Sequence, residues 1–296
     1  MQSGLATQDA EDWRARQIGF LLPDDLPRHF CPSQPEFSHA AAAFLAALPS
    51  LEPYFIRTVQ EAAASIDDPE LLQQIKMFNV QEARHAREHR AMNAWLARHY
   101  PELPRLERVI AERLDRSLKH DSLAYRLAYT SGYEAITYHL IGFMMEQRAT
   151  WLADAEPHVF ALLCWHGAEE VEHKSVAFDV FQRVCGNYRL RARGLADALV
   201  TTVKDLRGMM RYMLTVDGRW HQPDCRRAVR SLRLSFARGL LPRLLVYLRP
   251  SYHPSQYPDP PELQWWIDRY AAGDDLRSVS PTMLDGARAR STSTSR

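Results

Sequence analysis

The sequence predicts an all-α protein. Glycine contributes only 12 of the 296 residues, and the chain is rich in Ala, Leu, Arg and Glu, which favour helices. The apolar–polar alternation of half-buried strands and the Asn-Gly signal of tight hairpins are both missing. With 46% hydrophobic residues, the chain is also long enough to bury a sizeable core. We therefore expect a large bundle of helices.

The helix boundaries follow from prolines, glycine and capping residues. Asp68 followed by Pro69 is a helix start, and Pro101 ends that helix. Pro49 and Pro53 predict a break or kink in the first helix near residues 48–50, and Gly186 is a C-terminal stop. In chain order, we expect helices at 36–66, 69–99, 103–118, 122–147, 157–184, 190–214, 225–248 (interrupted at Pro242) and 262–272.

Three regions are expected along the chain. Residues 1–35 contain several prolines and form an N-terminal arm that wraps the rest. Residues 36–249 form the helical bundle with additional helices. Residues 250–296 begin with a Pro-rich segment and end in a low-complexity tail, GARARSTSTSR at 286–296, which we expect to be disordered.

Charge and cysteine usage exclude several functional classes. The chain has 37 Lys+Arg and 36 Asp+Glu, so its net charge of +1 is not that of a strongly basic nucleic-acid-binding protein. No apolar leader and no run of 18 apolar residues occurs. The cysteines are scattered without a C-x-x-C pair, which predicts a reduced, cytoplasmic chain with neither a disulfide nor a zinc framework: Cys31, Cys164, Cys185 and Cys225.

Two Glu-x-x-His motifs are the strongest chemical signal in the sequence. They are Glu82/His85 on the second expected helix and Glu170/His173 on the helix at 157–184. Residues i and i+3 of a helix lie ~60° and ~4.5 Å apart, so each pair can hold a metal ion. A helical di-metal carboxylate site also needs one Glu from each of two further helices.

Glu52 and Glu134 supply the two further carboxylates. Glu52 and Glu82 lie about equally far from the turn at 67–68, so antiparallel packing brings them together, whereas Glu61 would lie opposite residues 72–74. Glu134 lies midway along its helix, where Gly132 leaves room for a close neighbour. Four buried carboxylates would repel one another unless cations neutralise them.

Other polar residues near the motifs have open roles. His166 shares a helix face with Glu170 and His173 and is the leading candidate for a seventh ligand, with His89 as the alternative. Either could instead hydrogen-bond a ligand. Tyr138, one turn after Glu134, is the candidate catalytic hydrogen-bond donor or electron relay. Glu169 and Glu172 are expected to be solvated or paired with Lys174 and arginines.

These motifs resemble those of bacterial proteins described as predicted metal-dependent hydrolases, within the wider ferritin-like di-iron carboxylate group. The resemblance covers most of residues 25–255 and rests on DLPRHF, EPYFIRTVQ, DPELL, FNVQEARHAREHRAMN, WHGAEEVEHKSVAFDVF and YLRPSYHP. It implies a ferritin-like four-helix bundle with a di-metal site and extra C-terminal helices. The pattern of His166, Glu170 and His173 is similar to the three-histidine site of di-iron arylamine N-oxygenases.

The leading functional prediction is a non-haem di-iron oxygenase that oxidises a small organic substrate with O2. A Glu/His ligand set without Cys suits two Fe ions, or Mn or mixed Fe/Mn, and Zn less well. The expected metal ligands are Glu52, Glu82, His85, Glu134, His166, Glu170 and His173. Such an enzyme needs an external electron donor. The alternative is a di-metal hydrolase that cleaves an ester or phosphoester with a bridging hydroxide, and the third hypothesis is metal storage or a scaffold.

The helix at 225–248 is unusually basic. Seven arginines occur from Arg226 to Arg249 with no acidic residue between them, interleaved with Leu, Phe and Val. This pattern is typical of a helix that touches a membrane surface, although Leu244 falls on the same face as Arg226. The alternative is a packed helix whose arginines reach acids on its neighbours. We expect no nucleic-acid partner, and a homodimer is left open.

Overall fold

The computed structural model describes residues 15–20 and 22–285, and within these ranges it contains helices and irregular segments but no strand. The all-α prediction is confirmed. The helices are α1 (Pro35–Ala63), α2 (Pro69–His99), α3 (Leu103–His120), α4 (Leu123–Glu146), α5 (Arg148–Trp151), α6 (Pro157–His173), α7 (Val176–Val184), α8 (Tyr188–Val216), α9 (Pro223–Tyr247) and α10 (Pro261–Ala271), with short 3-10 turns η1 (Pro254–Gln256) and η2 (Pro281–Leu284). The predicted disordered tail at 286–296 and the first 14 residues of the arm lie outside the described residues.

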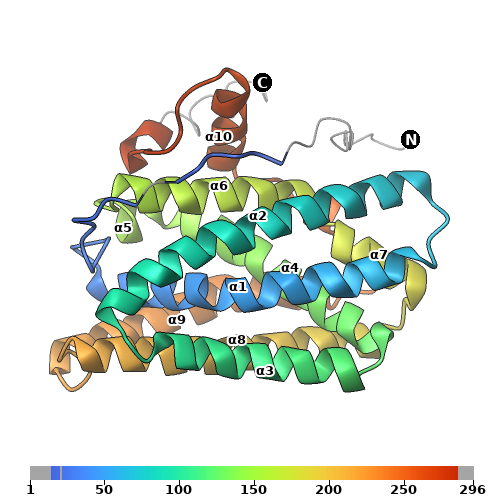
Figure 1. Ribbon diagram of the computed structural model, residues 1–296, viewed down its shortest axis with the longest axis horizontal. Helices are drawn as coiled ribbons and strands as arrows, with labels where there is room; N and C mark the ends of the chain where they lie inside the picture. Colours follow the sequence, from blue (N-terminus) through green and yellow to red (C-terminus); the bar gives the residue numbers. More distant parts are fainter. Residues whose placement is uncertain (1–14, 21, 286–296) are drawn as a thin grey trace.

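Four helices form the centre of the molecule. α1 packs against α2, α2 against α6, α6 against α4, and α4 against α1, which closes a ring of four (Figure 1). The line of α6 is continued by α7, which packs on α4, α2 and α1. A four-helix core of this kind is what a ferritin-like arrangement requires.

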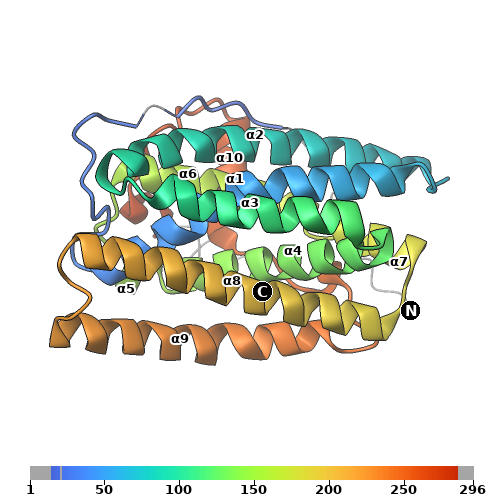
Figure 2. The same cartoon turned by 60° about the horizontal axis from the view of Figure 1, so that its bottom comes forward.

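Further elements cover this core on two sides. α3, α8 and α9 pack on the side formed by α1 and α4, and α9 lies at the outer edge (Figure 2). On the opposite side, α10 packs on α6, and the arm runs between these two helices (Figure 1). The buried hydrophobic residues form one continuous core from Phe20 in the arm to Leu284 near the end of the described chain.

Several local predictions are confirmed. The Asp68 side chain accepts hydrogen bonds from the backbone N–H groups of Glu70 and Leu71, and Pro69 begins α2. Gly186 follows the end of α7 with a φ of 61°, in the left-handed region that glycine adopts without strain. The space at Gly132 is occupied by the backbone of α8, because a Cβ atom there would lie 2.7 Å from the Cα atom of Leu195.

The predicted break in the first helix is wrong. α1 is one helix from Pro35 to Ala63 and contains both Pro49 and Pro53. A proline inside a helix costs about 3 kcal/mol through a lost hydrogen bond and a clash. Most of α1 is buried between its neighbours, and each fully buried large apolar side chain stabilises by roughly 1.5–3 kcal/mol. Packing along the whole helix therefore outweighs the two local defects. Pro242 likewise lies inside the uninterrupted α9.

The predicted single helix at 157–184 is also wrong, because it divides into α6 and α7 at residues 174–175. Neither proline nor glycine marks this break. The Lys174 ammonium group donates to the carboxylate of Asp259 and to the carbonyl oxygen of Tyr257. Both partners belong to the Pro-rich segment after α9. The residue at the break is thus held by a part of the chain that is distant in sequence.

Candidate metal centre

The seven predicted ligands lie together in the middle of the four-helix core. α1 contributes one of them, α2 two, α4 one and α6 three; all are at most 3% exposed: Glu52, Glu82, His85, Glu134, His166, Glu170 and His173. The helical spacing i, i+3 places each Glu-x-x-His pair on the inward face of its helix. Glu61, the rejected alternative on α1, is exposed and pairs instead with Arg126 at 2.7 Å.

The seven residues form two groups, each of a size suited to one ion. Glu52, His85 and His166 offer ligand atoms that all lie within 4.8 Å of one another. The same holds for the second group, which consists of Glu82, Glu134, Glu170 and His173. All seven are therefore placed in metal-sized clusters of oxygen and nitrogen donors.

Glu82 and Glu170 connect the two groups. Glu82 Oε1 lies 3.4 Å from His85 Nδ1 in the first group and 3.6 Å from His173 Nε2 in the second. Glu170 Oε1 lies 3.3 Å from His166 Nε2 in the first group and 3.4 Å from His173 Nε2 in the second. The two carboxylates from the two motifs thus lie between the two groups, and they would be shared if each group held an ion.

The electrostatics of the cluster oppose ionisation of its acids. Burial, and after it the charge of Glu82, raises the pKa of Glu52 well above its ordinary value. Burial and then the charge of Glu170 have the same effect on the pKa of Glu134. The pKa of Glu82 is also raised, mainly by burial, although His85 opposes the shift. Cations placed among these carboxylates would remove the cause of all three shifts.

The polar atoms of the cluster support the same conclusion. Buried oxygen and nitrogen atoms almost always have hydrogen-bond partners. Several here have none among the described residues: both carboxylate oxygens of Glu52, one each of Glu82, Glu134 and Glu170, and the ring nitrogens His85 Nδ1, His166 Nε2, His173 Nδ1 and His173 Nε2. They are acceptors or potential metal donors that converge on one volume. The residues present therefore fit a pair of metal ions.

His85 is oriented by Glu169, a residue expected to be solvated or paired with Lys174 and arginines. Glu169 is fully buried, and its Oε2 lies 3.0 Å from His85 Nε2. A proton on Nε2 leaves the lone pair of Nδ1 available to a metal ion, which is the arrangement that orients histidine ligands in metal sites. Burial alone would lower the pKa of His85, but the neighbouring carboxylates of Glu169 and Glu82 raise it well above its ordinary value.

The N-terminal arm supplies the partner of Glu169 and Glu172. The backbone N–H of Arg16 donates to Glu169 at 2.8 Å, and the Arg16 guanidinium binds the Glu172 carboxylate through both terminal nitrogens. Of the two alternatives expected for Glu169 and Glu172, solvation or pairing with Lys174 and arginines, the structure shows pairing with an arginine. No sequence pattern links residue 16 to α6, so this contact could not be anticipated.

His89 lies behind His166 rather than among the seven ligands. His89 Nε2 is 3.0 Å from His166 Nδ1, and His166 Nε2 faces Glu170. If His166 Nδ1 carries the proton and donates it to His89, the lone pair of Nε2 is free for a metal. Burial lowers the pKa of both histidines well below the ordinary value, so both are neutral. A neutral imidazole is the form that binds metals.

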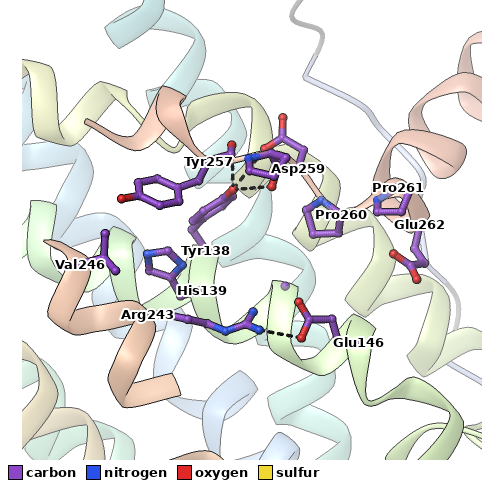
Figure 3. A pocket seen from close by; sticks show the side chains of 12 residues that line it. Tyr138, His139, Glu146, Arg243, Val246, Tyr257, Asp259, Pro260, Pro261 and Glu262 are labelled. Carbon is purple, nitrogen blue, oxygen red and sulfur yellow. Dashed lines mark hydrogen bonds and ion pairs between the residues drawn. The ribbon is translucent and has the colours of Figure 1, made fainter. Parts of the chain in front are cut away.

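Tyr138 is directed away from the cluster. Its hydroxyl lies within 3.2–3.4 Å of the carbonyl oxygens of Tyr257 and Pro258 and of an Asp259 carboxylate oxygen (Figure 3). It lines a cavity of about 610 Å³ between α4, α9 and the Pro-rich segment, together with His139 and Arg243. The structure thus does not bring Tyr138 to the seven ligands, and its catalytic role stays a prediction.

A second polar cluster was not anticipated. The carboxylate of Asp217, just after α8, accepts hydrogen bonds from four side chains: Arg28, His29, His39 and Tyr100. Its carboxylate oxygens thus already accept hydrogen bonds from side chains of the arm, of α1 and of the end of α2. We interpret this cluster as a structural clamp. The motif DLPRHF contains Arg28 and His29, but nothing in the sequence links it to His39, Tyr100 or Asp217.

Comparison with known proteins adds one finding. A family model with the description "Predicted metal-dependent hydrolase" matches residues 14–257, which is most of the chain and includes all seven candidate ligands. No curated protein and no solved structure matches the chain.

Proposed function

Since the chain belongs to the family of predicted metal-dependent hydrolases, we propose that it is a two-metal enzyme that hydrolyses an ester or phosphoester. The observation that carries the proposal is the pair of adjoining donor clusters, joined by Glu82 and Glu170. Glu52, His85 and His166 would hold one ion, Glu134 and His173 the other, and the two motif carboxylates would be shared. The donor set suits Fe or Mn, and Zn is also compatible with it.

The chemistry supplied by such a pair of ions is Lewis-acid activation of water and of a substrate oxygen. The protein itself holds the ligand side chains in the protonation state and the orientation that metal binding requires. The Glu169 carboxylate accepts a hydrogen bond from the Nε2–H group of His85. The backbone N–H of Arg16 donates a second hydrogen bond to Glu169. Aromatic rings exclude water from the cluster: Trp165 lies 4.9 Å from His85, and Phe78 lies 4.9 Å from His173, measured between ring centroids.

We propose the cavity beside Tyr138 as the place where the substrate binds. Tyr138 is one helical turn beyond Glu134 on α4, and the Asp259 side chain on the cavity wall pairs with Lys174, which follows His173. Of the elements that line the cavity, α4 also carries Glu134, a candidate ligand of the second group. Its volume of about 610 Å³ is within the ~300–1,000 Å³ range of small-molecule sites.

A di-iron oxidoreductase that uses O2 is the second candidate. It is favoured by the Cys-free set of four carboxylates and three histidines, in which His166 Nε2 lies 3.3 Å from the shared Glu170. Hard oxygen and nitrogen donors of this kind accommodate both Fe(II) and Fe(III). This candidate also requires an electron donor, whereas hydrolysis requires none.

One pair of assays separates the two candidates. Protein loaded with Mn or Zn is tested for hydrolysis of nitrophenyl acetate and nitrophenyl phosphate, and anaerobically reduced Fe-loaded protein is tested for O2 uptake. The proposal predicts hydrolysis with redox-inert Zn that Glu170→Ala abolishes and Glu61→Ala leaves unchanged, because Glu61 lies outside the cluster. O2 uptake that Glu170→Ala abolishes, without hydrolysis by any metal form, would instead establish the oxidoreductase.

A further inference from the structure

Positive charge is concentrated in one stretch of the chain. Residues 189–249 contain fourteen Lys or Arg and four Asp or Glu, a formal charge of +10, whereas the whole chain carries +1. The remaining residues therefore carry −9. This stretch makes up α8, α9 and their connection, which lie together along one edge of the molecule (Figure 2). A nearly neutral protein thus has one strongly basic side.

Most arginines of α9 do not pair with acids on neighbouring helices. Five of them are exposed, and none forms an ion pair with a carboxylate in the described part of the chain: Arg226, Arg227, Arg230, Arg233 and Arg238. Arg243 differs, because it pairs with Glu146 at 2.6 Å. The alternative, in which the arginines of α9 pair with acids on neighbouring helices, therefore holds for Arg243 but not for these five.

Leucines are exposed among these arginines. Leu234 and Leu241 are each 43% exposed, and Leu245 is 63% exposed. At ~100° per residue, the three fall within ~40° of one another on the helix, and the five exposed arginines lie within ~100° of that stripe. Leu244, which shares a face with Arg226 in the sequence pattern, is buried. The exposed face of α9 therefore carries leucines and arginines side by side.

The position of α9 leaves this face accessible. α9 packs on α4 and α1 by its other side, which includes Val229, Leu240 and Tyr247, and forms the outer edge of the molecule (Figure 2). It is a 25-residue helix, hence roughly 38 Å long. Within the described residues, no element covers the stripe of Leu234, Leu241 and Leu245.

We propose that this face of α9 docks on a membrane surface rich in anionic lipids. Arginines attract the headgroups, and the leucine stripe enters the boundary of the acyl chains. A nucleic-acid partner would account for the arginines but not for three exposed leucines, and the exposed face of α9 offers no aromatic ring for base stacking. The inference does not depend on the metal centre.

The test is vesicle flotation of the full chain at low and high salt. We expect binding to vesicles of phosphatidylcholine with phosphatidylserine, little binding to phosphatidylcholine alone, and weaker binding as salt rises. Three arginines each contribute roughly a factor of five in partitioning, so Arg230→Gln, Arg233→Gln and Arg238→Gln together should weaken binding by roughly 100-fold. Replacing Leu234, Leu241 and Leu245 by Ser should weaken it with the charge unchanged.

The matched control removes three exposed charges from α3, by Arg108→Gln, Arg116→Gln and Lys119→Gln. This control should bind like the parent protein, and all variants should keep the parent's thermal unfolding midpoint. Absence of binding to the anionic vesicles would overturn the proposal, and so would an equal loss in the α3 control, which would indicate a net-charge effect. Binding to single-stranded RNA without binding to vesicles would replace the membrane by a nucleic acid.

Discussion

His166 and His89 are adjacent in space but differ in the atoms that they present to the metal cluster. His166 directs Nε2 toward Glu170, whereas His89 directs Nε2 toward His166 and reaches Glu52 only at 3.7 Å. One is therefore placed as a ligand and the other as the partner that fixes its protonated nitrogen. This pair offers a sharp test at the scale of single residues.

We predict that His166→Ala weakens binding of one of the two ions by more than the ~10–100-fold that loss of a ligand's hydrogen-bond partner costs. His89→Ala should have the smaller effect, because it leaves all seven candidate ligands in place. The measurement is metal content after dialysis against a chelator, with the visible spectrum of the Co(II)-substituted protein. Equal metal loss in the two variants would contradict the assignment.

Spacing within a helix was enough to find the two motifs and His166, because i, i+3 and i, i+4 fix which side chains share a face. Glu52 was found from its distance to the turn at 67–68 and Glu134 from its place midway along its helix, and the structure brings both beside the motifs. The same reasoning failed for Glu169, which lies off the ligand face of α6 and is buried by Arg16 of the arm. A contact over 153 positions of sequence leaves no periodic signal.

At the scale of elements, α4 and α8 approach each other closely at two glycines. A Cβ atom on Gly194 would lie 2.3 Å from the backbone oxygen of Ala128, and Gly132 faces Leu195 in the same way. Two glycines thus allow the backbones of the two helices to touch. α4 carries Glu134 two residues after Gly132, so this contact also fixes the position of a candidate ligand.

We predict that Gly194→Ala lowers the free energy of unfolding by about 1–3 kcal/mol or more, because backbone atoms must move apart. Gly208→Ala on the same helix is the matched control. A Cβ there has no atom within 4 Å, so it should stabilise by up to about 1 kcal/mol through helix propensity. Urea unfolding of both variants checks this, and a neutral Gly194→Ala would refute the close packing.

Helix ends were predictable where local chemistry sets them and not where packing does. Asp68 with Pro69 and Gly186 mark ends by their own capping or backbone preference. Pro49 did not break α1, because the burial of its neighbours outweighs the local cost. The division between α6 and α7 depends on Lys174 meeting the segment around Asp259, so the residues at the break carry no signal of it.

At the scale of the molecule, the described part of the N-terminal arm is fastened to the bundle at two places. Arg16 fastens the arm to α6 and lies 5.9 Å from the ring centroid of Trp266 in α10. Asp217 fastens the arm to the end of α8 through Arg28 and His29, and also binds His39 and Tyr100. Both contacts are made by networks of charged side chains, so the stability that they contribute depends on pH.

The Asp217 clamp predicts a specific loss of stability in acid. Burial alone would raise the pKa of Asp217, but hydrogen bonds from Arg28, His29, His39 and Tyr100 lower it to about 2, below its ordinary 3.8. A lowered carboxyl pKa contributes stability that is fully present above about pH 4 and is lost as pH falls through about 2. Burial also lowers the pKa of His39, which adds a loss of the same sign below about pH 6.5.

Asp217→Asn should therefore cost about 1–3 kcal/mol at pH 7, as for hydrogen bonds to a charged group. Its free energy of unfolding should also fall less steeply than the parent's between pH 4 and pH 2. Urea titrations at a series of pH values measure both quantities. Parallel curves for the two proteins over that interval would show that the Asp217 carboxylate does not contribute in this way.

The account as a whole depends on a pair of metal ions held by residues from four helices. The most direct measurement is the metal-to-chain ratio of protein purified without added metal, together with Glu82→Ala, Glu170→Ala and the control Glu61→Ala. We predict about two ions per chain in the parent protein and in Glu61→Ala, as in other four-helix di-metal sites, and loss of most of the metal in the other two variants. A parent protein without metal, or full occupancy in both Glu82→Ala and Glu170→Ala, would contradict the account.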